Sequence, residues 1–229
     1  MTPERWYKVI MTPNAPLSLT VAGKMYSLDA AMAKFVDYPG KTPLLFDLPG
    51  AGEHDQLTLQ EVARTRKVSS RISHKEAAYF VDTAQTAPWI KTSADLEHAD
   101  PRSETGLFTA MAELFEHFRV PAPRGVNFAK ISKVLHLKQP GLFPLLDSHI
   151  ARAYKPSAKQ LRSEFPEFGW RRHTWIAVRN DLLDARSSGA LDELRNRLIA
   201  YESQDPSKQE AVRRLDQLTD LRLLDILVW

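Results

Sequence analysis

One segment, GVNFAKISKVLHLKQPGLFPLLDSHI (residues 125–150), constrains the fold more than any other part of this 229-residue chain. It begins with a tight turn, because both Gly125 and Asn127 are residue types that tolerate a positive φ. Apolar residues then recur on one face of a helix, which ends at Gln139-Pro140-Gly141. An apolar connector leads to Asp147, at the start of another helix. The segment therefore predicts a hairpin with outward-facing amides and one carboxylate at the mouth of the next helix.

This segment resembles the hairpin and catalytic-aspartate region of the helix-hairpin-helix (HhH-GPD) DNA glycosylase superfamily. The pattern of that superfamily is roughly Gly-hydrophobic-Gly, a helix, an apolar connector and Asp-Thr-His-hydrophobic. Residues 125–150 align with it without a gap, so that Asp147-Ser148-His149-Ile150 falls on the catalytic-aspartate end. In two places the chain departs from the pattern. Asn127 replaces the second hairpin glycine, and Ala129 replaces the Schiff-base lysine of the bifunctional members.

The resemblance implies a mainly α-helical, helix-hairpin-helix glycosylase-like fold. It also implies a monofunctional glycosylase that cleaves the N-glycosidic bond of a damaged or modified base, with Asp147 as the catalytic carboxylate beside the developing positive charge. The predicted DNA contacts are Gly125, Val126, Asn127, Lys130 and Lys133. The target base must leave the stack, and the candidates for its pocket are Trp89, Phe143, Trp170 and Trp175.

Each of these assignments has a structural alternative that the sequence leaves open. Asp147 can instead be a helix N-cap or the partner in a buried ion pair. The turn at residues 125–127 can be an ordinary connection between two helices.

Positive charge is concentrated around the predicted hairpin. Residues 119–180 contain twelve Lys or Arg against three acidic residues, whereas the rest of the chain is net acidic. Arg171 and Arg172 lie between Trp170 and Trp175, and such interleaving of aromatic and basic side chains suits a nucleic-acid surface. The alternative is a helix start with Trp175 buried. Double-stranded DNA is therefore the expected partner, with Arg171 and Arg172 among its contacts.

Composition excludes several classes of site. The chain has no cysteine, so it can form neither a disulfide nor an iron–sulfur cluster. No spacing of His, Asp and Glu suggests a metal site, and no cofactor is expected. The sequence contains neither an apolar run long enough to span a membrane nor an apolar signal-peptide core at its start, so we expect a cytoplasmic protein.

The chain divides into two predicted lobes. Residues 1–101 form an N-terminal helical lobe with possible short strands, because apolar and polar residues alternate near residue 19. Residues 102–229 contain the hairpin and C-terminal helices, the last of them at about 207–229. The segments VLHLKQPGLFPLLDSHI and LRLLDILVW also resemble an uncharacterised bacterial family.

Two further hypotheses compete with the glycosylase. The first is a helix-hairpin-helix protein that binds DNA without catalysis. The second is a helical protein-interaction module, which could dimerise through its apolar C-terminal helix. The sequence leaves the target base, the pathway and the oligomeric state open.

Overall fold

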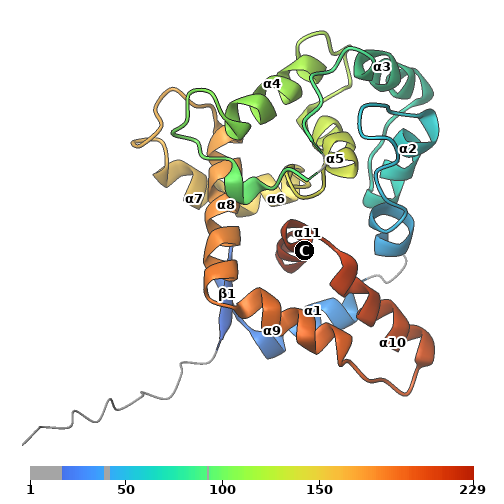
Figure 1. The fold of residues 1–229 in the computed structure, drawn as a ribbon, viewed down its shortest axis with the longest axis vertical. Helices are drawn as coiled ribbons and strands as arrows, with labels where there is room; N and C mark the ends of the chain where they lie inside the picture. The colour runs from blue at the N-terminus through green and yellow to red at the C-terminus, as the bar shows by residue number, and fades with distance from the viewer. Residues whose placement is uncertain (1–16, 39–41, 92) are drawn as a thin grey trace, which may run out of the picture.

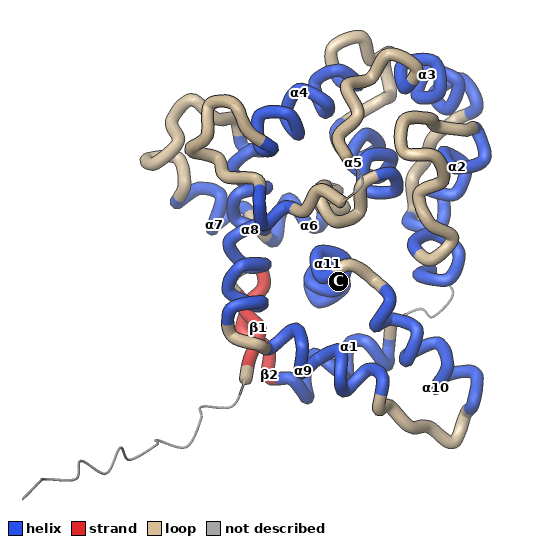
Figure 2. The backbone as a smooth tube through the Cα atoms, viewed as in Figure 1, coloured by secondary structure: helices blue, strands red, loops and turns tan. Residues whose placement is uncertain are grey.

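The computed structural model describes residues 17–38, 42–91 and 93–229. Helices dominate, and Figure 2 shows the strands as one small antiparallel pair near the N-terminal end. The strands are β1 (Ser18–Val21) and β2 (Lys24–Ser27). The α-helices are α1 (Leu28–Asp37), α2 (Leu59–Arg64), α3 (His74–Ala84), α4 (Leu107–Arg119), α5 (Phe128–Lys138), α6 (Ser148–Ala153), α7 (Lys155–Gln160), α8 (Trp170–Ser187), α9 (Ala190–Ile199), α10 (Pro206–Arg213) and α11 (Asp220–Val228). A π-helical turn, η1 (Pro43–Asp47), and three 3₁₀ turns, η2 (Thr65–Val68), η3 (Leu96–His98) and η4 (Arg214–Gln217), complete the fold.

The predicted mainly α-helical class with a small N-terminal β element is confirmed. Local signals account for most helix starts. Thr58 and Glu61 form a capping box at α2, and Ser73 and Glu76 form another at α3. The glycosylase-like version of the fold stays a prediction.

The β-hairpin packs against α8 through its turn. The inward side chains of β1 are Leu19 and Val21, which are fully buried, as the alternating pattern predicts. Ala22 adopts a positive φ of 53° in the turn, and its amide donates to Asp181 Oδ2 of α8 at 2.7 Å. Burial raises the pKa of Asp181 to about 6, although this hydrogen bond opposes the shift.

Replacing Asp181 with asparagine should stabilise the protein at neutral pH. The raised pKa means that the ionised carboxyl costs folding free energy above about pH 6, by at most about 3 kcal/mol. Asparagine removes that cost and can still accept from the Ala22 amide. The gain should shrink as the pH falls towards 4, where the Asp181 of the natural chain is protonated in the folded state. Thermal melts at several pH values test this, with Asp82→Asn on the exposed side of α3 as the charge-matched control.

One apolar cluster runs through both predicted lobes, from Leu19 in β1 to Leu227 in α11. In Figure 1, the long helix α8 runs down one side of the molecule, and α11 lies near the centre of the view. Every residue of α11 from Leu221 to Leu227 is buried. The apolar C-terminal helix is therefore covered by its own chain and presents no free face for dimerisation. The lobe boundary near residue 101 stays a prediction.

The single terminal helix predicted for residues 207–229 is wrong, because the chain turns between α10 and α11. Leu218 adopts an extended ψ of 155°, and Thr219 then caps α11 by accepting from the Arg222 amide. Pro156 also does not break the chain as its residue type suggested. It lies in the first turn of α7, where a missing amide hydrogen costs nothing.

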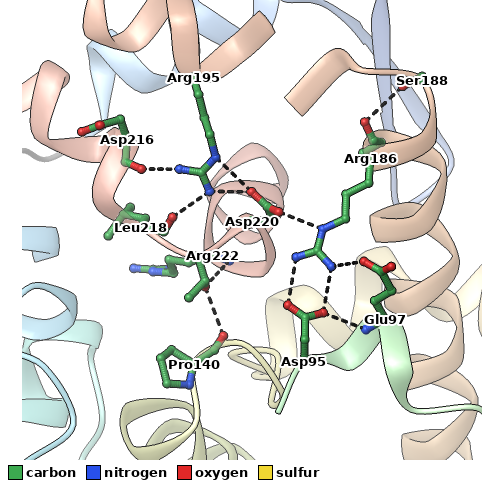
Figure 3. A network of polar contacts seen from close by, with 12 residues as sticks. Asp95, Glu97, Pro140, Arg186, Ser188, Arg195, Asp216, Leu218, Asp220 and Arg222 are labelled. Atoms are coloured by element: carbon green, nitrogen blue, oxygen red, sulfur yellow. Dashed lines mark hydrogen bonds and ion pairs between the residues drawn. The ribbon is translucent and has the colours of Figure 1, made fainter. Parts of the chain in front are cut away.

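A polar network fixes the start of α11 against three other elements (Figure 3). The Arg186 guanidinium of α8 forms a bidentate pair with the Asp95 carboxylate, with both hydrogen bonds at 2.9 Å. It also donates to Asp220 of α11 at 2.8 Å. Arg195 of α9 bonds to the same Asp220. The Thr219 hydroxyl donates to the Pro140 carbonyl in the connector after α5 at 3.1 Å. This network holds α11 beside the connector that carries Asp147. No helix among the described residues is long and apolar enough to cross a membrane.

Candidate functional site

The α4–α5 hairpin contains the turn that the sequence predicts. Gly125 has a φ of 104°, which only glycine adopts without strain. Asn127 caps α5, since its side-chain oxygen accepts two first-turn amides at 3.1 Å each. Within the described part of the chain, the amides of Gly125, Asn127 and Phe128 have no acceptor. These three amides are what the hairpin can offer to a phosphate oxygen.

Glu76 of α3 lies against the hairpin from one side. The Lys130 ammonium donates to Glu76 Oε1 at 2.5 Å, so this lysine is in an intramolecular ion pair rather than free for phosphate. A methyl group added at Gly125 would lie 2.8 Å from the same oxygen. The amide of Ser73 holds Glu76 in place at 2.7 Å. The shape of the hairpin therefore depends on the absence of a side chain at Gly125.

Gly125→Ala should destabilise the protein by about 2 kcal/mol, because a strained φ and a displaced Glu76–Lys130 pair add together. Gly189→Ala is the matched control. Gly189 also has a positive φ, of 72°, but an added methyl group would meet nothing within 4 Å. It should cost only about 1 kcal/mol, which is the backbone effect alone. Denaturant titrations measure both, and equal losses would contradict the role assigned to Glu76.

Asp147 is the N-cap of α6, which is one of the two structural roles that the sequence leaves open for it. Its Oδ1 accepts from the His149 amide at 2.8 Å and from the Ile150 amide at 3.1 Å. Its Oδ2 lies 3.7 Å from the ammonium of Lys133, and the residue as a whole is 7% exposed. Asp147 is therefore both a helix N-cap and a partner in a buried ion pair. Its catalytic role stays a prediction.

Lys133 does not reach the surface as a DNA contact would. Its side chain is buried beside Asp147, because α5 turns this face towards α11. Burial lowers the pKa of the Lys133 ammonium, and the nearby carboxylates of Asp147 and Asp225 oppose that shift. Lys133 is therefore an internal partner of Asp147 and not the phosphate contact that the sequence predicts.

Arg222 of α11 is the centre of a buried group of ionisable side chains next to Asp147. Its guanidinium bonds to Asp225 and to both oxygens of Asp47, at 3.2 and 3.3 Å, and donates to the Tyr38 hydroxyl at 2.8 Å. His136 Nε2 lies 3.6 Å from Asp47 Oδ1 and has no hydrogen-bond partner. Burial raises the pKa of Asp225 to about 6, although Arg222 acts in the opposite direction. Among the described residues no three His, Asp or Glu side chains converge as a metal ion requires.

Two cavities meet this group, and Arg222 lines both. The larger, which we call the α1–α11 cavity, has a volume of about 480 Å³. Its apolar and aromatic lining comes from Tyr38, Val68, Leu145, Ile226 and Trp229, with Lys34 and Lys67 also present. The smaller, of about 270 Å³, is lined by Asp47 and His136, among others.

Asp147 is close in sequence to the larger cavity but does not line it. Leu145, two residues before it, is part of the lining. His149, two residues after it, stacks on Trp229 with ring centres 4.8 Å apart, and Trp229 is also part of the lining. The Asp147 segment is therefore connected to the cavity through these two neighbours.

Two of the predicted base-pocket residues are core residues instead. Phe143 and Trp175 are buried, and they pack edge to face with ring centres 6.0 Å apart. Trp89 is half-buried, donates to the Ala84 carbonyl and packs on Phe118. Trp170 alone of the four is largely exposed.

The two predicted DNA-contacting arginines differ in their surroundings. Arg171 pairs with Glu116 and lies 4.0 Å from the centre of the Phe115 ring, so its charge is already matched within the chain. Arg172 lies over Phe168 and has no ion pair among the described residues.

The group around Arg222 is not among the sites that the sequence predicts. One signal was available, because Arg222 and Asp225 are the only charged residues between Leu221 and Trp229, in an otherwise apolar helix. Charges at that spacing in a buried helix require partners. The partner Asp47 could not be identified in the same way, since it lies 175 residues away in the chain.

The model of a family of unknown function (DUF6308) matches residues 82–229, which is more than half of the chain. The match includes the α4–α5 hairpin, Asp147 and Arg222, whereas Tyr38 and Asp47 lie outside it. No curated protein and no solved structure matches the chain.

Proposed function

We propose that this chain, which belongs to the DUF6308 family of unknown function, binds duplex DNA through the α4–α5 hairpin and cleaves the N-glycosidic bond of a damaged or modified base. One observation carries the proposal. The Asp147 carboxylate is held by two backbone amides through Oδ1, while Oδ2 accepts no hydrogen bond within the described residues and lies 3.7 Å from the Lys133 ammonium. Leu145, two residues before it, lines the α1–α11 cavity. A carboxylate fixed in this way needs no reorganisation to face a developing positive charge.

The reaction requires little from the protein beyond this charge. The bond between the base nitrogen and C1′ of the sugar breaks, and its electron pair leaves with the base, which takes up a proton. The sugar acquires oxocarbenium character, which Asp147 stabilises. A water oxygen then bonds to C1′ and loses a proton, and the product is an abasic site. Asp147 Oδ2 is the atom that would stabilise the cation and orient the water.

The α1–α11 cavity is the proposed pocket for the extruded base. Its volume of about 480 Å³ lies within the range of small-molecule sites, which is roughly 300–1,000 Å³. Tyr38 and Trp229 supply aromatic surfaces on which a flipped base can stack. Tyr38 and Trp229 thus take the stacking role that the sequence assigns to Phe143 and Trp175.

A specific observation favours a second candidate, a DNA-binding protein without catalysis. Asp147 is only 7% exposed and already has two cap bonds and a lysine partner. These contacts are a sufficient structural reason for an aspartate at this position. The two candidates share the hairpin and its DNA contacts, so they differ in base release alone.

The experiment is a lesion screen with the full-length protein. Duplexes that each carry one damaged or modified base are incubated with the protein, and abasic sites are scored by alkaline strand cleavage. Release from at least one duplex supports the enzyme. Salt-dependent binding without any release supports the second candidate. An affinity for duplex DNA that does not change with salt contradicts both.

A further inference from the structure

A third cavity, which we call the α7–α8 cavity, has a volume of about 300 Å³ and shares no lining residue with the α1–α11 cavity. Its lining consists of Ala151, Lys155, Ala158, Lys159, Arg162, Trp170, His173 and Thr174. Lys155 and Lys159 are four residues apart on α7, and Arg162 follows in the next turn, so the three cations share one side. No acidic residue is part of the lining. In the part of the chain that the structure describes, none of the three cations forms an ion pair or a side-chain hydrogen bond.

Trp170 and His173, which line the same cavity as the three cations, have features of a nucleotide site. Trp170 is 45% exposed, and its ring is supported edge to face by Phe128 at 5.0 Å. His173 is only 3% exposed, and its Nε2 bonds to the Phe165 carbonyl at 2.8 Å. Its Nδ1 is buried and has no partner, which is costly unless a ligand or water supplies one.

We propose that the α7–α8 cavity is a nucleotide-phosphate subsite, in which Lys155, Lys159 and Arg162 hold the phosphate and Trp170 stacks with the base. Three cations around one concavity supply N–H donors and positive charge for the oxygens of a phosphate group, and an exposed supported indole is a stacking surface for any base. Lysines as point charges and an arginine fork are both common phosphate ligands.

The position of the cavity favours a nucleic-acid strand as the source of this phosphate. Phe128, which supports Trp170, is the first residue of α5 and directly follows the cap of the α4–α5 hairpin. A strand bound at the hairpin can therefore continue over Trp170 into the cavity. The subsite extends the DNA contact of the proposed function but does not depend on catalysis by Asp147.

The test compares the natural chain with the variant Lys155→Ala/Lys159→Ala/Arg162→Ala. Fluorescence anisotropy measures the binding of labelled single-stranded oligothymidine over a range of salt concentrations, and calorimetry measures the binding of thymidine 5′-monophosphate. We expect the triple variant to lose affinity by about tenfold or more, and its salt slope to fall by about 0.7, as expected for one phosphate of a single strand that is no longer neutralised. Trp170→Ala should weaken binding by about fivefold or more without changing the slope.

The control is Lys75→Ala/Lys91→Ala/Lys208→Ala, which removes the same charge from exposed lysines outside the cavity. An equal loss in this control would overturn the proposal, because net charge alone would then explain the binding. Unchanged binding of both probes by the triple variant would also overturn it. Loss for the oligonucleotide supports a strand as the source, and loss for the mononucleotide alone supports a free nucleotide in the same subsite. Base release is not measured here, so this test can fail or succeed independently of the lesion screen.

Discussion

Replacing Asp147 with asparagine should reduce base release by about 100-fold or more. It should also lower the melting temperature, because the buried Lys133 ammonium loses its carboxylate partner. Asparagine is as good a helix N-cap as aspartate, so its side-chain oxygen can keep the bonds from the His149 and Ile150 amides. What the variant removes is the negative charge that faces the sugar cation. The measurement is single-turnover base release from the lesion duplex that the natural chain processes, alongside a thermal melt.

Asp147→Ala separates the cap from the charge. It should lose base release to the same extent and in addition lose about 1 kcal/mol of stability, because two amides of α6 lose their acceptor. Duplex affinity should persist in both variants, since the hairpin is untouched. Full base release by Asp147→Asn would rule out a catalytic role for this residue and leave its capping role as the whole explanation.

The hairpin and its neighbouring helices could be predicted because their signals are local. Gly125, Asn127 and Gln139-Pro140 each act on the backbone within a few residues, and the structure has a turn, a cap and a helix end at these positions. The structure also has a helix start at Trp170 with Trp175 buried, which is one of the two interpretations that the sequence leaves open for this segment.

The surroundings of each side chain could not be predicted, because they depend on contacts between distant segments. Lys133 and Lys130 are three residues apart and looked equivalent, yet one is buried beside Asp147 and the other pairs with Glu76. Trp175 and Trp170 are likewise similar in sequence context but lie in the core and on the surface. The walls of the α1–α11 cavity come from separate parts of the chain, which include α1, η2, the connector before α6 and the C-terminal helix α11, and no sequence spacing connects them.

Arg222→Leu should have the largest effect on stability of any change discussed here, about 3–5 kcal/mol. Leucine fills much of the same space but leaves Asp47 and Asp225 buried without their cation, and the Tyr38 hydroxyl loses its donor. For a domain of this size, the loss corresponds to a fall in melting temperature on the order of 10 °C. Urea titration and thermal melts measure it, with Arg71→Leu as the control at an exposed arginine that has no ion pair within the described residues.

The pH dependence of the Arg222→Leu defect distinguishes a lost ion pair from lost packing. Asp225 already has a pKa of about 6 because it is buried, and removing the Arg222 cation raises that pKa further. A carboxyl group with a raised pKa in the folded state binds its proton more tightly there, so the variant regains stability as the pH falls through this raised pKa, which lies above about 6, towards the ordinary aspartate pKa of about 4. The double variant Arg222→Leu/Asp225→Asn should recover part of the loss at pH 7 for the same reason. A defect that is equal at pH 5 and pH 8, and that the second substitution does not relieve, would mean that the side-chain volume of Arg222 matters rather than its charge.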